Sequence, residues 1–156
     1  MSVSAEEPPF SSLWANGQVK GKPKRRPTPG VIEHIPLQTP LDVAIARTTT
    51  RKLADELGYS MIDQVRLATI TFEIADQIVT YAGQGEIIIS WRENTGRHGL
   101  QFSCHDQGRH APQLTTLWQT GETDSNILNI KRQVDEFKFT QDPHHGNCIS
   151  LTVWLE

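Results

Sequence analysis

The fold is decided by residues 46–87, which read ARTTTRKLADELGYSMIDQVRLATITFEIADQIVTYAGQGEI. This stretch contains the end of one predicted helix and the whole of a second, separated by Gly58. The first helix begins upstream, where Thr39 is suited to cap it, Pro40 takes the first helical position and Asp42 follows the cap by three residues. Glycine is a common helix terminator, so the sequence predicts that this helix ends near Gly58 and that a second begins directly after it.

The second helix is the longest element that the sequence predicts. Ser60 and Asp63 repeat the capping arrangement, and Gly83 and Gly85 end the helix. Apolar residues at alternating spacings of three and four form one face, namely Met61, Val65, Ala68, Phe72, Ala75, Val79 and Ala82. A second set widens this face, namely Leu67, Ile70, Ile74, Ile78 and Tyr81. We therefore expect this helix to be covered on more than one side.

The rest of the domain alternates β-rich runs with two short helical patterns. Strands are predicted at residues 31–37, 86–92, 100–106, 137–140 and 148–155, and helices at 113–119 and 126–136. Polar turns at 93–99 and 142–147 join strands into hairpins, and such short connections make neighbouring strands antiparallel. The predicted fold class is α+β, a two-layer sandwich of a mixed, mostly antiparallel sheet with helices on one face.

The N-terminal residues differ in composition from the rest. Residues 1–30 hold five of the nine prolines and a basic run, with no sustained periodicity. We predict a flexible tail over 1–30 and one domain over 31–156, a length that can bury its own core. Within the tail, Phe10, Leu13 and Trp14 form a small apolar island. A solvated leader is the favoured interpretation of this island, and a docking patch for a partner is the alternative.

The charge balance excludes several classes of partner. The formal net charge is −3, which argues against direct binding of nucleic acid or of a membrane surface. No signal-peptide pattern opens the chain, and no apolar run approaches the roughly 18 residues that a membrane span needs. We therefore expect a cytoplasmic protein whose two cysteines, Cys104 and Cys148, are reduced thiols.

Two groups of polar residues are candidates for chemistry. Glu73, Asp76 and Gln77 share one face of the mostly apolar second helix, where a carboxylate could activate a nucleophile beside an oxygen ligand for Mg²⁺. A solvated helix edge is the plainer interpretation of these three. Asp106 ends a strand and Gly108 follows it. The Asp106 carboxylate could accept a hydrogen bond from the exocyclic amine of a ligand, and Gly108 would let that ligand approach the backbone. Ordinary turn chemistry explains this pair equally well.

Four segments, taken in order, carry a resemblance to one family. They are residues 46–87, DQG at 106–108, IKRQVDEF at 130–137, and Gly146. Together they resemble the RsbT-type serine kinases and anti-sigma factors, which have the GHKL ATP-binding fold of gyrase, histidine kinases and MutL. The likeness covers roughly residues 35–156.

The resemblance implies roles for individual residues, with ATP and Mg²⁺ as cofactors. Glu73 matches the family's general base, and Asp106 matches the aspartate that reads the adenine amine. Gly108 matches the first glycine of that turn, and Gly146 the glycine of the last nucleotide motif. Gln77 stands where the family has the asparagine that holds Mg²⁺.

The departures from the family gather on the phosphate side of this site. The methylene that Gln77 adds moves its oxygen by about 1.5 Å, which an octahedral Mg²⁺ site would not tolerate well. Asp76 reverses the charge of a frequent arginine, and His110 replaces a glycine. The family then has a glycine-rich lid, whereas this chain has one glycine, Gly121, between residues 109 and 145. Asn147 replaces the threonine that follows the family's last glycine. Charge from Lys131 and Arg132 could compensate, although an exposed helix face is the favoured interpretation of that pair.

A zinc site is a competing hypothesis. Its candidate ligands would be Cys104, His105, His110, His144, His145 and Cys148. Their spacing matches no familiar zinc motif, and Cys104 and His105 should face opposite sides of their strand. We therefore favour the nucleotide-site interpretation over metal binding.

Two functions follow from the resemblance. The first is a partner-switching regulator with ATP binding weakened or lost, which binds a STAS-type antagonist and, in competition, a sigma factor or an SpoIIE/RsbU-type phosphatase. The second is an active divergent protein-serine kinase that phosphorylates the STAS partner, with Glu73 as base and Gln77 on Mg²⁺. Several phosphate-side departures occurring together favour the first. A homodimer is compatible with either function.

Overall fold

The computed structural model describes residues 27–107, 111–120, 127–142 and 146–155, and the backbone of residues 14–15 and 18–19. Its elements follow the chain as β1 (Trp14–Ala15), β2 (Gln18–Val19), β3 (Gly30–Leu37), α1 (Pro40–Glu56), α2 (Met61–Ala82), β4 (Gly85–Asn94), β5 (Arg97–His105), α3 (Pro112–Thr120), α4 (Ile127–Gln133), β6 (Glu136–Asp142) and β7 (Gly146–Leu155). β1 and β2 form a short antiparallel pair. The other strands form one sheet in the order β3-β4-β5-β7-β6.

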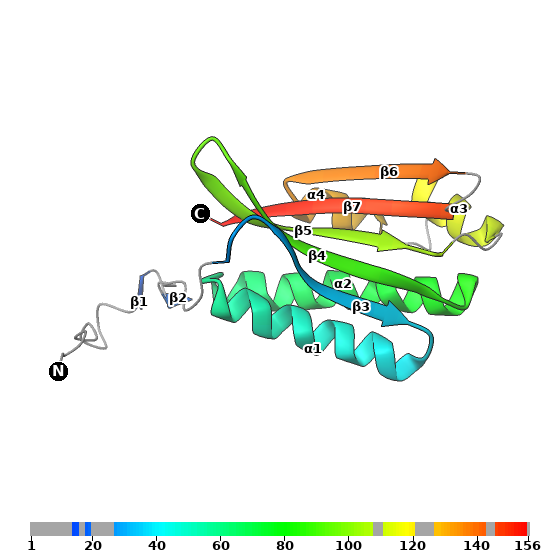
Figure 1. The fold of residues 1–156 in the computed structure, drawn as a ribbon, viewed down its shortest axis with the longest axis horizontal. Helices are drawn as coiled ribbons and strands as arrows, with labels where there is room; N and C mark the ends of the chain where they lie inside the picture. The colour runs from blue at the N-terminus through cyan, green and yellow to red at the C-terminus, as the bar shows by residue number, and fades with distance from the viewer. Residues whose placement is uncertain are drawn as a thin grey trace.

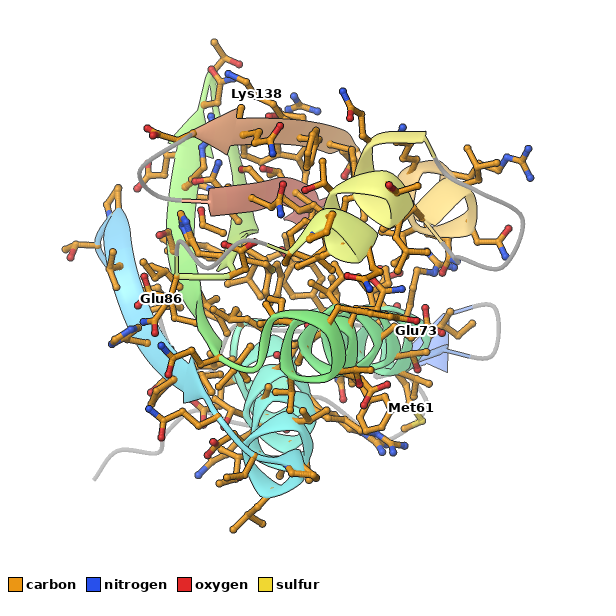
Figure 2. All side chains as sticks on the ribbon, turned by 90° about the vertical axis from the view of Figure 1, so that its right-hand side faces the viewer. Met61, Glu73, Glu86 and Lys138 are labelled. Carbon is orange, nitrogen blue, oxygen red and sulfur yellow. The ribbon has the colours of Figure 1, made fainter. Side chains whose placement is uncertain are left out.

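The predicted α+β sandwich is confirmed. Every neighbouring pair of the five-stranded sheet is antiparallel. Figures 1 and 2 show α1 and α2 side by side on one side of this sheet, with α3 and α4 on the same side near β6 and β7. β3 begins at Gly30, one residue before the predicted domain start, and the division at residue 30 stays a prediction.

The predicted caps of the two long helices are present. Thr39 caps α1 in a complete capping box: its side chain accepts from the Asp42 N–H, and the Asp42 carboxylate accepts from the Thr39 N–H. The Ser60 side chain accepts from the Asp63 N–H at the start of α2, and Gly83 ends α2 with a φ of 83°. These local signals fixed the helix boundaries because each satisfies N–H or C=O groups that a helix end leaves open.

The expected covering of α2 on more than one side is confirmed, because α2 packs against α1, α3 and the strands β3, β4 and β5. α2 buries a set that includes Leu67, Ile70, Ile74 and Ile78. Met61, Val65 and Phe72, expected on a covered face, are exposed, as is Tyr81. α1, α3 and the sheet cover the buried residues, whereas the exposed ones face solvent, except that the Arg47 guanidinium lies over the Phe72 ring. α2 has 22 residues, yet no described helix is apolar enough to cross a bilayer.

Two boundaries differ from the sequence expectation. The polar turn expected at residues 93–99 is a tight one at Thr95 and Gly96, whose φ values of 48° and 84° suit a hairpin turn. Gly99 therefore lies within β5, where it pairs with Trp154. α4 stops at Gln133 rather than residue 136, since β6 begins at Glu136 and draws the chain into the sheet.

One buried hydroxyl joins the helices to the sheet. Tyr59, in the connection between α1 and α2, accepts from the Leu100 N–H at 2.9 Å and donates to the Val153 C=O at 2.6 Å. Leu100 and Val153 are register partners on β5 and β7, so the hydroxyl bridges two facing backbone groups. This contact fixes the helix hairpin against the middle of the sheet.

Candidate functional site

Asp106 lies where β5 ends, next to the start of β7. Its side chain is fully buried and receives two hydrogen bonds from one residue. The Asn147 backbone N–H donates to Oδ1 at 3.1 Å, and the Asn147 side-chain amide donates to Oδ2 at 2.7 Å. The Asp106 N–H in turn donates to the Asn147 C=O at 3.3 Å. Both carboxylate oxygens are thus engaged by the protein itself, which is how a buried carboxylate is stabilised.

The backbone on both sides of this contact adopts left-handed conformations. Gly146 has a φ of 80°, which glycine adopts without strain, and it presents the Asn147 N–H to Asp106. Gln107 has a φ of 56°, which is uncommon for a residue with a side chain. Gly146, predicted as part of a nucleotide motif, therefore lies beside Asp106. Gly108 and His110 lie outside the described residues.

A second layer of hydrogen bonds ties α3 to the same strand ends. Asn147 Oδ1 lies 2.9 Å from the Thr115 hydroxyl, which donates to it. That hydroxyl also lies 3.2 Å from the Ala111 C=O one helical turn earlier. The Gln141 side-chain amide donates to Thr115 Oγ1 at 3.5 Å. Asn147 therefore links Asp106 to the first turns of α3.

The α2 side of the site is closed by α3. The indole N–H of Trp118 donates to Gln77 Oε1 at 2.8 Å, and Trp118 is fully buried. Glu73 lies one turn before Gln77, half-buried, on the side of α2 turned away from the sheet (Figure 2). Asp76 is exposed, as its plainer interpretation expected. Among the predicted phosphate-side residues, Gln77 therefore accepts a hydrogen bond from within the protein, from Trp118.

The contact with Trp118 involves the oxygen that the family resemblance assigns to Mg²⁺. The indole N–H points at Gln77 Oε1 and engages one of its two lone pairs. Lys131 and Arg132 on α4 are exposed, and the Lys131 ammonium lies 5.2 Å from the centre of the Phe137 ring. Their favoured interpretation as an exposed helix face agrees with this placement.

The described candidate zinc ligands lie on opposite faces of the sheet. Cys104 is buried on the helix side, whereas His105 faces the other side, as alternation along a strand requires. Cys148 Sγ lies 3.8 Å from His105 Nε2, and burial raises the pKa of both thiols. Within the described part of the chain, no three potential ligands converge on one point. His110, His144 and His145 lie outside that part.

Sequence reasoning missed the two residues that now define the site. Asn147 was noted only as a departure from a threonine, and its pairing with Asp106 needed the register that sets His105 opposite Cys148. Trp118 belongs to the short predicted helix at residues 113–119, and no local sequence pattern links its indole to Gln77. The one available signal was the cost of burying an indole N–H, which calls for an acceptor nearby.

One curated protein is similar to this chain over most of its length. The serine/threonine-protein kinase RsbT of Bacillus subtilis (strain 168) is 33% identical over 124 residues, which cover 76% of this chain and 93% of that protein. No family model matches the chain.

Proposed function

Because the chain belongs to the RsbT family of serine/threonine kinases, which have the GHKL fold and act in partner-switching systems, we propose that it is a partner-switching regulator with ATP binding weakened or lost. The proposal assigns regulation to protein docking rather than to phosphoryl transfer. Under this proposal the protein has the family's architecture, but its nucleotide site binds ATP weakly or not at all.

A single observation carries this proposal, namely the contact between Trp118 and Gln77. Phosphoryl transfer depends on positioning the triphosphate and on neutralising its charge. In this chain the side chain at the metal-ligand position accepts from a fully buried indole instead. Rotation of Gln77 away from Trp118 would leave the buried indole N–H without this acceptor.

The partner proposed for the regulator is a STAS-type antagonist. A second partner, either a sigma factor or an SpoIIE/RsbU-type phosphatase, would compete with it in the cytoplasm. Family membership supports this choice, since partner-switching modules pair RsbT-like proteins with STAS domains. A homodimer remains compatible with both partners.

An active kinase is the second candidate function, and two observations favour it. The similar protein from Bacillus subtilis is itself a serine/threonine kinase. Glu73, which the resemblance matches to a general base, is a half-buried carboxylate on α2 that could take a proton from a substrate serine. This function requires the Gln77 oxygen to bind Mg²⁺ either beside its contact with Trp118 or in place of it.

Calorimetric titration of the full chain with ATP·Mg²⁺ separates the two functions. The regulator predicts no heat of binding and no thermal stabilisation up to millimolar nucleotide. Stabilisation that Asp106→Ala abolishes, while Asp76→Asn on the exposed face of α2 leaves it intact, would overturn the proposal. Phosphoserine on an added STAS protein, lost in Glu73→Gln, would then establish the kinase.

A further inference from the structure

The α1–α2 hairpin exposes an apolar surface that the described chain leaves uncovered. Met61 is 52% exposed, Val65 47% and Phe72 37%, and all three lie on one side of α2. On α1, Ile45 is 45% exposed. Figure 2 shows Met61 on the side of α2 turned away from the sheet. Exposed apolar side chains gathered on one helix face mark interaction surfaces more often than scattered ones do.

A hollow of about 500 Å³ lies along α1 and reaches α2 at Gln64. We call it the α1–α2 groove, and its lining consists of Arg47, Thr48, Arg51, Lys52, Asp55 and Gln64. Three cations and one carboxylate give the lining a net charge of +2, opposite in sign to the chain's −3. The carboxylate, Asp55, accepts from Gln64 at 3.4 Å.

The basic and apolar parts of this surface are in contact. The Arg47 guanidinium lies 5.8 Å from the centre of the Phe72 ring, which places a cation from α1 over an exposed aromatic of α2. Arg47, Arg51 and Asp55 follow one another at spacings of four along α1, so they line one edge of the groove. Residues 47–55 span about 12 Å at 1.5 Å per residue, or a little over two helical turns.

We propose that the α1–α2 groove binds an acidic amphipathic helix of a protein partner. A groove between two helices accepts a third helix through apolar side chains at i, i+3, i+4 and i+7. Here such side chains would contact Val65 and Phe72, while carboxylates of the same helix would pair with Arg51 and Lys52. The inference does not rest on the proposed loss of ATP binding, because the groove lies on α1 and the N-terminal half of α2, away from Asp106.

Charge argues against the two other occupants. A second copy of the chain would bring the same basic lining against itself across a two-fold axis, placing like charges together. The chain's own residues 1–30 hold two acids, Glu6 and Glu7, against five basic residues, Lys20, Lys22, Lys24, Arg25 and Arg26. Pro8 and Pro9 follow these acids directly in the sequence, and proline is disfavoured in a helix interior.

The test uses the full chain without nucleotide and a labelled synthetic peptide of about 18 residues. The peptide carries leucine at i, i+3, i+4 and i+7 and glutamate elsewhere on its surface. A scrambled peptide of identical composition keeps the charge and loses the apolar face. Fluorescence anisotropy should show saturable binding of the first peptide and at least tenfold weaker binding of the second.

Matched variants locate the binding. Arg51→Glu and Phe72→Ser, both at exposed positions of the hairpin, should each weaken the amphipathic peptide about tenfold without changing the unfolding temperature by more than a few degrees. Lys138→Glu makes the same charge reversal on β6 (Figure 2) and should leave the affinity unchanged.

Three outcomes would overturn the proposal. Equal affinity for both peptides, or an equal loss in Lys138→Glu, would show unspecific charge attraction. A dimer seen by sedimentation that Arg51→Glu dissociates would make a second copy the occupant. Tenfold tighter peptide binding in the double variant Glu6→Lys, Glu7→Lys would place the chain's own N-terminal residues in the groove.

Discussion

The indole N–H of Trp118 donates to the side-chain oxygen of Gln77 across 2.8 Å and joins α3 to α2. Trp118 is fully buried, so water cannot replace this acceptor if Gln77 turns away. The contact therefore has two consequences. It holds α3 against α2, and it engages the oxygen that the family resemblance assigns to Mg²⁺.

Trp118→Phe should lower the free energy of unfolding by about 1–3 kcal/mol, because it leaves the Gln77 oxygen without its donor and shortens a buried side chain. Urea denaturation followed by circular dichroism measures the change. Gln119→Ala, at the exposed neighbouring position, should stay within about 0.5 kcal/mol of the wild type. A wild-type stability in Trp118→Phe would show that the contact does not hold α3.

Asn147→Ala should destabilise the protein by about 1–3 kcal/mol, because the Asp106 carboxylate loses the amide donor at 2.7 Å while remaining buried. Thermal unfolding of both proteins at neutral pH measures the loss. Gln141→Ala serves as control, since it removes only an exposed contact of 3.5 Å to Thr115. If the two variants were equally stable, the Asn147 amide would contribute nothing to holding Asp106.

Gly85→Ala should destabilise the protein by at least 1–3 kcal/mol, since a methyl group there would lie 2.1 Å from the His105 C=O and 2.5 Å from Ile78 Cγ2. The same position lies 3.1 Å from the Asp106 Cα, so relief of the overlap should displace the strand end that carries Asp106. Amide chemical shifts of Asp106 and Asn147 report this displacement. Ser90→Ala, further along β4, should change neither the shifts nor the stability appreciably.

Alkaline pH should destabilise the protein through Cys104. Burial raises the pKa of its thiol in the folded state, whereas a cysteine in the unfolded chain has a pKa of about 8.5. The group's contribution is therefore fully present below about pH 8.5 and is lost as pH rises toward the folded pKa. At pH 9.5 this amounts to about 1.4 kcal/mol for one thiol.

Urea titrations at pH 7.5, 8.5 and 9.5, in a phosphine reductant, measure this loss. In Cys104→Ala the overall stability falls through lost packing, but the decline between pH 8.5 and 9.5 should be shallower than in the wild type. An identical decline in both proteins would assign it to other groups. Cys148, whose pKa burial also raises, contributes to the slope that remains.

The helices and strands were largely predictable because their signals are local. Thr39 and Asp42 form their capping box within four residues, and Gly83 ends α2 through its own backbone conformation. The order of elements and the antiparallel sheet followed from short connections. The identities of Glu73, Asp106 and Gly146 as candidates also came from the chain alone, through the family resemblance.

The state of the site was decided by tertiary contacts. Asp106 and Asn147 meet across 41 residues of sequence, as do Gln77 and Trp118, and no periodicity specifies such pairs. The same holds for α2: its apolar pattern predicted covering on more than one side, but which of its apolar residues are buried depends on where α1, α3 and the sheet pack. Local sequence determines which backbone hydrogen bonds form, whereas the partners of buried polar groups depend on which elements pack together.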